Sequence, residues 1–460
     1  MNEMFPTFKR FFAWVRRNGL RPARFLGRAA RKSWKPVLLT LLIINAVFSL
    51  SSYLERKYMP KPIVETSMWD REKYNSSKNP FRHYETAVRM IQDKDREVLE
   101  NLWDSKNKYS RVIPPTAEQA KIALMHMQPA FTELRNGAAC RGEDYEIQEK
   151  KPSFTEYSPE LYWFRKLAKL AAYDAVGKVK RGQTRDGLAE LIAVIEMGND
   201  FRRKGPPEYI LVGHSIVCIG QREIMKLLNR LSEDDSCLRL VCSELARLDS
   251  QSPGLESDLK TEYAFTRRAM QEFFWLSWPQ SIDILDTDSV GITALMYCSI
   301  PGMRTWMLRN YDRMWGVILS RYDEPYPVLI KLELNRTVPK LDFINRILSG
   351  LLNRFFEVDA RDKTLNHGIM LMAALEAYRL EHGQYPDKLD ALVGIYIKKL
   401  PTDPFADGKP FIYSRKGNEY LLYSVGLDMK DNGGKKLGRD ARHNETGDYV
   451  FAPGADVWPD

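Results

Sequence analysis

Three patterns of apolar and polar residues follow one another along the chain of 460 residues. Residues 36–54 form one apolar run without a charged side chain. From about residue 81 to 275, apolar positions recur every three to four residues, which is the period of amphipathic helices. Near residues 410–425, apolar and polar positions alternate, which is the period of strands. Together the patterns predict an α+β protein that is mainly α.

The apolar run, PVLLTLLIINAVFSLSSYL, predicts a single N-terminal transmembrane helix over residues 36–54. At about 1.5 Å per residue, a run of this length comes close to the ~30 Å hydrocarbon thickness of a bilayer. A buried core helix and a cleaved signal peptide are the alternatives. The residues after Leu50 offer only a poor small-x-small cleavage site, which favours a retained signal-anchor in contact with the lipid bilayer.

The charge of the chain is concentrated directly before this run. Residues 1–35 contain ten Lys or Arg and one acidic residue, a net of +9, which equals the net charge of the whole chain. The rest of the chain is therefore neutral overall, and this excludes the broad basic surface of a nucleic-acid-binding protein. By the positive-inside rule, residues 1–35 form a cytoplasmic segment. We expect a single-pass protein of the bacterial inner membrane, with most of its chain in the periplasm.

The middle of the chain is predicted to be an array of α-hairpins. Residues 55–80 form a spacer, residues 81–275 a helical domain and residues 276–355 a helical connector interrupted by prolines. The clearest apolar stripe consists of Phe164, Leu167, Ala168, Ala171 and Ala175. Successive hairpins of this length resemble tetratricopeptide-like repeats, which usually present a concave surface to a protein partner. A plain helical bundle without a groove is the alternative.

No catalytic motif is found in the sequence. His214 lies in an apolar helical stretch and is expected to be a buried histidine with its hydrogen bonds satisfied, rather than a base or a ligand. The G-x-S-x-G motif of hydrolases is not met around Ser215, and H-E-x-x-H does not occur. We therefore predict that the protein is not an enzyme. An extracytoplasmic hydrolase with its site in the helical region is the alternative.

The cysteines give no framework for disulfides or metal. They are Cys140, Cys218, Cys237, Cys242 and Cys298. None forms a C-x-x-C pair, and their odd number leaves at least one thiol free. Cys237 and Cys242 lie five residues apart on a predicted helix, so they point to different faces.

The last part of the chain, residues 356–460, is predicted to be a small α+β module. A long helix ends at Gly383, which is a suitable terminator, with Pro386 beyond it. Two strands alternate around the Lys416–Gly417–Asn418 turn, and residues 448–453 supply a third strand. One long helix packed on a small antiparallel sheet is an α+β arrangement.

Three motifs follow one another in this module: A-L-x-x-Y-R-x-x-x-G-x-Y-P, L-P-x-D-P-F-x-x-G-x-P-x-x-Y and Y-x-L-Y-S-x-G-x-D-x-x-D. Their order, spacing and residue types resemble the globular head of the type II secretion major pseudopilins. The matching positions are Ala374, Leu375, Tyr378, Gly383, Tyr385, Pro386, Pro401, Asp403, Pro404, Phe405, Tyr413, Tyr423, Ser424, Gly426, Asp428 and Asp431. The resemblance covers about 85 residues.

The resemblance implies one structural Ca²⁺ in the C-terminal loop. Its ligands at the matching positions are Leu427, Asp428 and Asp431, with Asp448 as the distal ligand. A hard cation requires several oxygens around a flexible, Gly-rich turn, and residues 428–434 provide such a turn. The alternative is a solvated turn in which Asn-Gly-Gly only reverses the chain.

The chain also departs from the pseudopilin pattern. The Gly-Phe-Thr-Leu-x-Glu junction of true pseudopilins does not precede the apolar run, and some 300 residues separate that run from the module. Processing and assembly as a pseudopilus subunit are therefore not expected. We predict a membrane-anchored extracytoplasmic scaffold or adaptor, linked to secretion or envelope assembly. An atypical pilin-like subunit is a further alternative.

Overall fold

The computed structural model describes residues 46, 50, 51, 53–55, 57–64, 71–91, 93–104, 115–141, 159–204, 206–231, 233–274, 300, 302–332, 334–437 and 447–452. Most of the predicted transmembrane run, and the cytoplasmic segment before it, lie outside these residues. Within them, no helix has both the length and the apolar character needed to cross a membrane. The transmembrane helix therefore stays a prediction.

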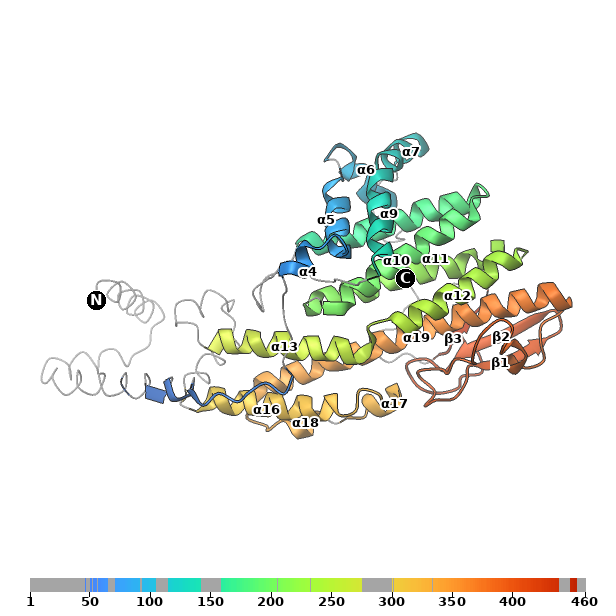
Figure 1. Ribbon diagram of the computed structural model, residues 1–460. Coiled ribbons are helices and arrows are strands. Elements are labelled where there is room, and N and C mark those ends of the chain that lie inside the picture. The colour runs from blue at the N-terminus through green and yellow to red at the C-terminus, as the bar shows by residue number, and fades with distance from the viewer. Residues whose placement is uncertain are drawn as a thin grey trace, which may run out of the picture. The chain divides into compact units, whose positions relative to one another are not determined.

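The described chain is mainly helical, with one small sheet near its C-terminal end, as the sequence patterns predict (Figure 1). The helices and strands are α4 (Arg71–Asn75), α5 (Pro80–Arg89), α6 (Asp93–Asp104), α7 (Ala117–His126), α8 (Gln128–Ala139), α9 (Pro159–Lys180), α10 (Thr184–Lys204), α11 (Pro207–Leu231), α12 (Asp235–Gln251), α13 (Gly254–Phe274), α16 (Met303–Leu319), α17 (Tyr326–Leu329), α18 (Leu334–Thr337), α19 (Phe343–His382), the 3-10 helix η1 (Leu389–Leu392), β1 (Ile412–Lys416), β2 (Glu419–Ser424) and β3 (Tyr449–Phe451).

The chain divides into two units, and the boundaries between them fall within α13, α16, α18 and α19. The smaller unit comprises residues 1–63, 267–314 and 337–346. Inside it, the buried Arg267 guanidinium donates to both carboxylate oxygens of Asp312, at 2.7 and 3.2 Å. The larger unit comprises residues 64–266, 315–336 and 347–460. It contains most of the predicted helical domain and the whole C-terminal module, and all of the sites discussed below lie in it.

Helices α9, α10 and α11 form successive antiparallel neighbours in the larger unit, as the α-hairpin pattern predicts. The backbones of α10 and α11 approach closely where Gly198 faces Gly213. A Cβ atom on Gly198 would lie 2.7 Å from the carbonyl oxygen of Gly213, so this crossing requires glycine. The likeness to tetratricopeptide repeats stays a prediction.

The core of this helical region is aromatic. Phe81 of α5 packs against Phe164 of α9 and Phe201 of α10, with ring centroids 5.4 and 5.0 Å apart. Tyr209 of α11 stacks on Phe201 at 5.7 Å. Four helices thus share one apolar cluster, whose burial from water supplies most of the driving force for their association.

The three strands form one antiparallel sheet in the order β1-β2-β3. Ile412 pairs with Tyr423, and Tyr423 pairs in turn with Val450. The hairpin between β1 and β2 turns at Gly417, as predicted. The sheet packs on α19 so closely that a Cβ atom on Gly368 would lie 2.1 Å from the ring of Phe451.

Helix α19 is 40 residues long and ends before Gly383, whose φ of 74° is that of a helix-terminating glycine. Its start lies well before the module boundary expected at residues 355 and 356, which falls within the helix. Asp342 accepts a hydrogen bond from the Asn345 backbone N–H and so caps the helix. The helix of the module therefore continues on its N-terminal side without a break into residues assigned to the connector.

Candidate functional site

Asp403, from the second sequence motif, organises the loops at one end of the sheet. Its buried carboxylate accepts hydrogen bonds from the Phe405 and Val425 backbone N–H groups, both at 3.0 Å, and from the Ser424 hydroxyl at 2.8 Å. Burial raises the pKa of this carboxyl group, and the donated hydrogen bonds oppose the shift. Asp403 therefore connects the 401–410 loop to the end of β2.

Other motif residues connect the sheet to the helix and to the C-terminal loop, which we define as residues 426–437. The Tyr385 hydroxyl donates to Glu376 of α19 at 2.7 Å, and the Tyr413 hydroxyl donates to the Pro386 carbonyl at 2.6 Å. The Tyr423 hydroxyl donates to Asp431 at 2.9 Å. The motif residues thus serve mainly to hold the module together.

The predicted calcium ligands lie in and beside this loop, with their carboxylates bound to nearby donors. Asp428 accepts hydrogen bonds from the Lys430 backbone and the Asn432 side chain, at 3.0 and 3.1 Å. Asp448 accepts them from the Asn432 and Gly434 backbone N–H groups, at 3.2 and 2.7 Å. Asp448 also ties the loop to β3, because its N–H donates to the Lys435 carbonyl.

The remaining two predicted ligands, Asp431 and Leu427, lie in the same loop. Asp431 accepts from the Gly433 backbone as well as from Tyr423, and Leu427 follows the Gly426 turn. Burial raises the pKa of Asp448, and the nearby charge of Asp431 raises it further against the opposing hydrogen bonds. Within the described part of the chain, no group of three or more His, Cys, Asp or Glu side chains is arranged to hold a metal ion.

A second polar centre, which the sequence analysis did not identify, lies between α19 and the helical region. It is a buried ion-pair cluster, which we define as Arg202, His214, Asp258, Asp359, Asp362 and Lys363. The members come from α10, α11, α13 and α19, and they are separated by up to 161 residues in sequence (202 to 363).

Arg202 and His214 bridge the carboxylates of this cluster. Arg202 donates to Asp258 at 2.9 Å and to Asp359 at 3.4 Å. The Nδ1 atom of His214 lies 2.5 Å from Asp362, and its Nε2 atom lies 3.3 Å from Asp258. Burial lowers the pKa of Arg202, but the three nearby aspartates outweigh this and raise it overall.

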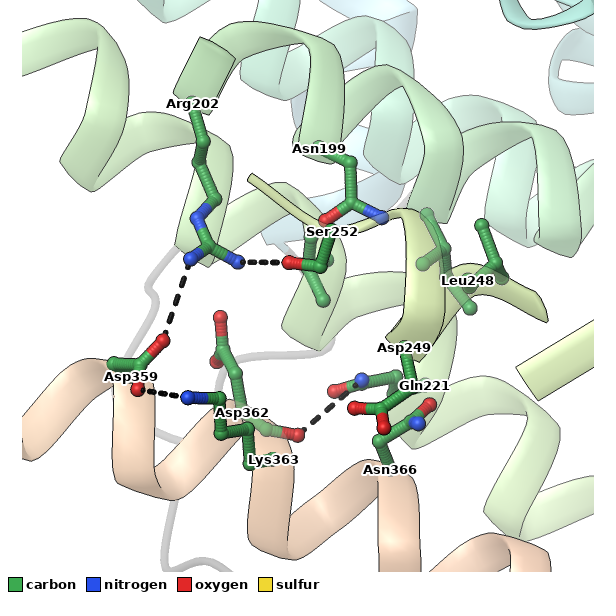
Figure 2. A pocket seen from close by; sticks show the side chains of 12 residues that line it. Asn199, Arg202, Gln221, Leu248, Asp249, Ser252, Asp359, Asp362, Lys363 and Asn366 are labelled. Carbon is green, nitrogen blue, oxygen red and sulfur yellow. Dashed lines mark hydrogen bonds and ion pairs between the residues drawn. The ribbon is translucent and has the colours of Figure 1, made fainter. Parts of the chain in front are cut away.

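A cavity of about 30 Å³ adjoins the cluster. Figure 2 shows Arg202 reaching from α10 toward Asp359, with Lys363 beside it on α19. Gln221 donates to the Asp362 backbone carbonyl, and its own side-chain oxygen is buried without a hydrogen-bond partner among the described residues. A cavity of this size and polarity is suited to one water molecule rather than to a substrate.

His214 is buried, as its apolar surroundings predict, and both of its nitrogens lie near carboxylates. Ser252 is the hydroxyl residue that lines the cavity, and its oxygen accepts a hydrogen bond from Arg202. The contacts described here therefore join charges between helices and do not include a hydrogen-bonded Ser–His pair. The sequence shows only that Arg202, Asp258, Asp359 and Asp362 are charged residues, and their burial is a finding of the structure.

The structure describes Cys140, Cys218, Cys237 and Cys242, and it joins no two of these four in a disulfide. Cys237 and Cys242 are both buried within α12, and no disulfide joins them. Cys298 lies outside the described residues.

Comparison with known families identifies the class of the C-terminal module. Residues 359–442, less than half of the chain, match the family model of protein G of the type II secretion system. The matched region begins within α19 and includes β1, β2 and the C-terminal loop. This confirms the resemblance to the pseudopilin head that the three motifs indicated. No curated protein and no solved structure matches the chain.

Proposed function

We propose that the protein is a non-enzymatic scaffold or adaptor of the bacterial inner membrane. Its pseudopilin-like module and helical domain lie in the periplasm, anchored by residues 36–54, and the module links the protein to secretion. The match of residues 359–442 to the protein G family carries the secretion-related part of this proposal. The charge-free run and the cluster of cations before it support the anchor and its orientation.

The way α19 is built into the fold supports a scaffold role. One continuous helix packs on the sheet at Gly368 and also bonds to the helical region through Asp359 and Asp362. The module therefore cannot change its position relative to these helices without breaking buried contacts. Such a rigid connection suits a protein that presents one surface in a defined place, with the helical domain offering a surface to a protein partner.

We also propose that the C-terminal loop takes up a structural Ca²⁺. Asp428, Asp431, Asp448 and the Leu427 carbonyl would hold it, and these hard oxygen donors suit calcium. The repulsion between Asp431 and Asp448 supports the proposal, because a cation would relieve it. In the present geometry the same carboxylates accept hydrogen bonds from the loop, so the ion would replace part of that network.

The secretion role is tested by removing the gene from the bacterium that makes the protein. We expect proteins that normally leave the cell to accumulate in the periplasm, and a wild-type copy to restore their release. A C-terminal alkaline phosphatase fusion, which is active only outside the cytoplasm, reports the orientation separately. Unchanged secretion with an active fusion would contradict the link to secretion but not the anchor. An inactive fusion on a stable, full-length protein would contradict the orientation.

A further inference from the structure

Helix α19 is fastened to the helical region by a set of buried polar contacts. Besides the ion pairs, the Asn366 side chain donates to the Leu245 carbonyl at 3.2 Å, and Gln221 donates to the Asp362 carbonyl at 3.4 Å. Arg239 of α12 bonds at the surface to Glu381 of α19. The joint thus extends along α19, and the buried ion-pair cluster is its most enclosed part, with Lys363 at the solvent-facing edge.

The position of His214 determines its protonation state. Its Nδ1 atom lies 2.5 Å from a carboxylate oxygen of Asp362, and its Nε2 atom lies 3.3 Å from one of Asp258. A neutral imidazole has one N–H and one lone pair, so one of its nitrogens would then present a lone pair to an anion. Only the doubly protonated ring donates to both carboxylates.

The balance of charges around His214 also requires that its imidazole ring be doubly protonated. The groups that face it are Arg202 of α10, Asp258 of α13, and Asp359 and Asp362 of α19, and Lys363 pairs with Asp359. Arg202 and Lys363 balance two of the three carboxylates, and protonated His214 balances the third. Asp249 of α12 is a further nearby carboxylate, which pairs with His367. Its side chain is 40% exposed and that of Lys363 is 42% exposed, so both lie at the edge of the cluster.

We propose that protonated His214 is the charge that fastens the pseudopilin-like module to the helical region, so that the joint weakens as the pH rises. Loss of the proton would leave the buried cluster with one uncompensated negative charge, next to a lone pair that faces a carboxylate. Because α11 contributes no other member to the cluster, the α11–α19 contact should open first. This inference is independent of the proposed role in secretion.

The pKa of His214 is shifted in the direction that this arrangement requires. Burial and the charge of Arg202 lower it, but Asp362 and Asp258 outweigh both, and the net shift is upward from 6.5. A raised pKa in the folded state means that the stabilisation is complete below the unfolded pKa. It is lost progressively as the pH rises to the folded pKa.

The test is hydrogen–deuterium exchange of the full-length protein in detergent from pH 6 to pH 10, corrected for the intrinsic exchange rate. Protection of peptides from α11 and α19 should fall by up to about tenfold per pH unit between pH 6.5 and the raised pKa. His214→Gln should reduce the protection at pH 6 and remove its pH dependence. Asp362→Asn, which removes one of the two carboxylates, should move the transition to a lower pH.

His126→Gln is the matched control, because His126 also pairs with an aspartate, Asp95, but at a partly exposed site away from α19. This variant should retain the wild-type pH profile of α19. Protection of α11 and α19 that does not change with pH in the wild type would overturn the proposal. So would a transition that persists unchanged in His214→Gln, or one that Asp362→Asn leaves at the same pH.

Discussion

Two groups of buried aspartates in this protein are stabilised in different ways. In the C-terminal module, Asp403 and Asp448 accept hydrogen bonds mainly from backbone N–H groups of nearby loops. At the joint with the helical region, Asp258, Asp359 and Asp362 face the side chains of Arg202, His214 and Lys363. The first group is stabilised by backbone donors that the chain geometry places, and the second is stabilised by the opposite charges of side chains.

The difference has consequences for stability and for control. Backbone donors neither titrate nor disappear when one side chain is replaced, so the module should be insensitive to moderate changes in pH above the range of its carboxylates. In a buried ion pair, the attraction between the two charges is offset by the cost of removing them from water. Removal of one partner therefore leaves an uncompensated charge in the interior. The joint is therefore the more vulnerable of the two regions, and it is the one in which a proton can act as a switch.

The largest effect should come from Arg202→Met, which keeps an apolar side chain of similar length but leaves Asp258 and Asp359 without their shared partner. We expect a loss of about 3–5 kcal/mol in the free energy of unfolding, measured by denaturant titration at pH 7. The control is Arg239→Met, which removes a surface arginine that also bonds to α19, through Glu381. It should cost less than about 1 kcal/mol. Equal losses in both variants would contradict a special role for the buried cluster.

A smaller loss should follow Asp403→Ala in the module. The substitution leaves the buried Phe405 and Val425 N–H groups and the Ser424 hydroxyl without their acceptor, at a cost of roughly 2–4 kcal/mol. The same denaturation assay measures it. Asp387→Ala, which removes a largely exposed partner of Arg415, should change the stability by less than about 1 kcal/mol. If Asp403→Ala were as mild as this control, the backbone-bonded aspartates would not be structural.

The smallest effect concerns calcium. Millimolar Ca²⁺ should stabilise the full-length wild type by about 1–3 kcal/mol relative to EDTA, because an ion bound only to the folded state adds to stability by mass action. Thermal unfolding with either addition measures the shift. Asp428→Asn/Asp431→Asn should abolish it while the module stays folded. A wild type that responds to neither Ca²⁺ nor EDTA would remove the ion from the account of the C-terminal loop.

Much of the module could be predicted from local patterns. The hairpin around Gly417 and the end of α19 before Gly383 follow from turn and terminator residues that act within a few positions. The start of α19 does not follow from these patterns, although Asp342 has the position and chemistry of an N-cap. The apolar periodicity of this stretch is interrupted by polar residues, so the pattern gave no clear signal there.

The buried ion-pair cluster could not be predicted in the same way. A sequence shows that Arg202 and Asp359 are charged, but 157 residues separate them, and ordinary charged residues lie on the surface. Their burial depends on where α10 and α19 come together, which is a property of the assembled helices. His214 shows most clearly how far prediction from the sequence reaches. Its apolar surroundings predict burial, but they do not predict the two carboxylates on either side of its ring.

The residue pattern alone was therefore sufficient for the mainly helical class, the small C-terminal sheet and the pseudopilin-like motifs, because periodicity, turn residues and short spacings are local properties. The folded chain was needed to reveal that Asp403 joins the module's loops, that α19 belongs to both the module and the helical packing, and that six distant charges meet beneath it. These features depend on non-local packing, which places side chains together irrespective of their separation along the chain.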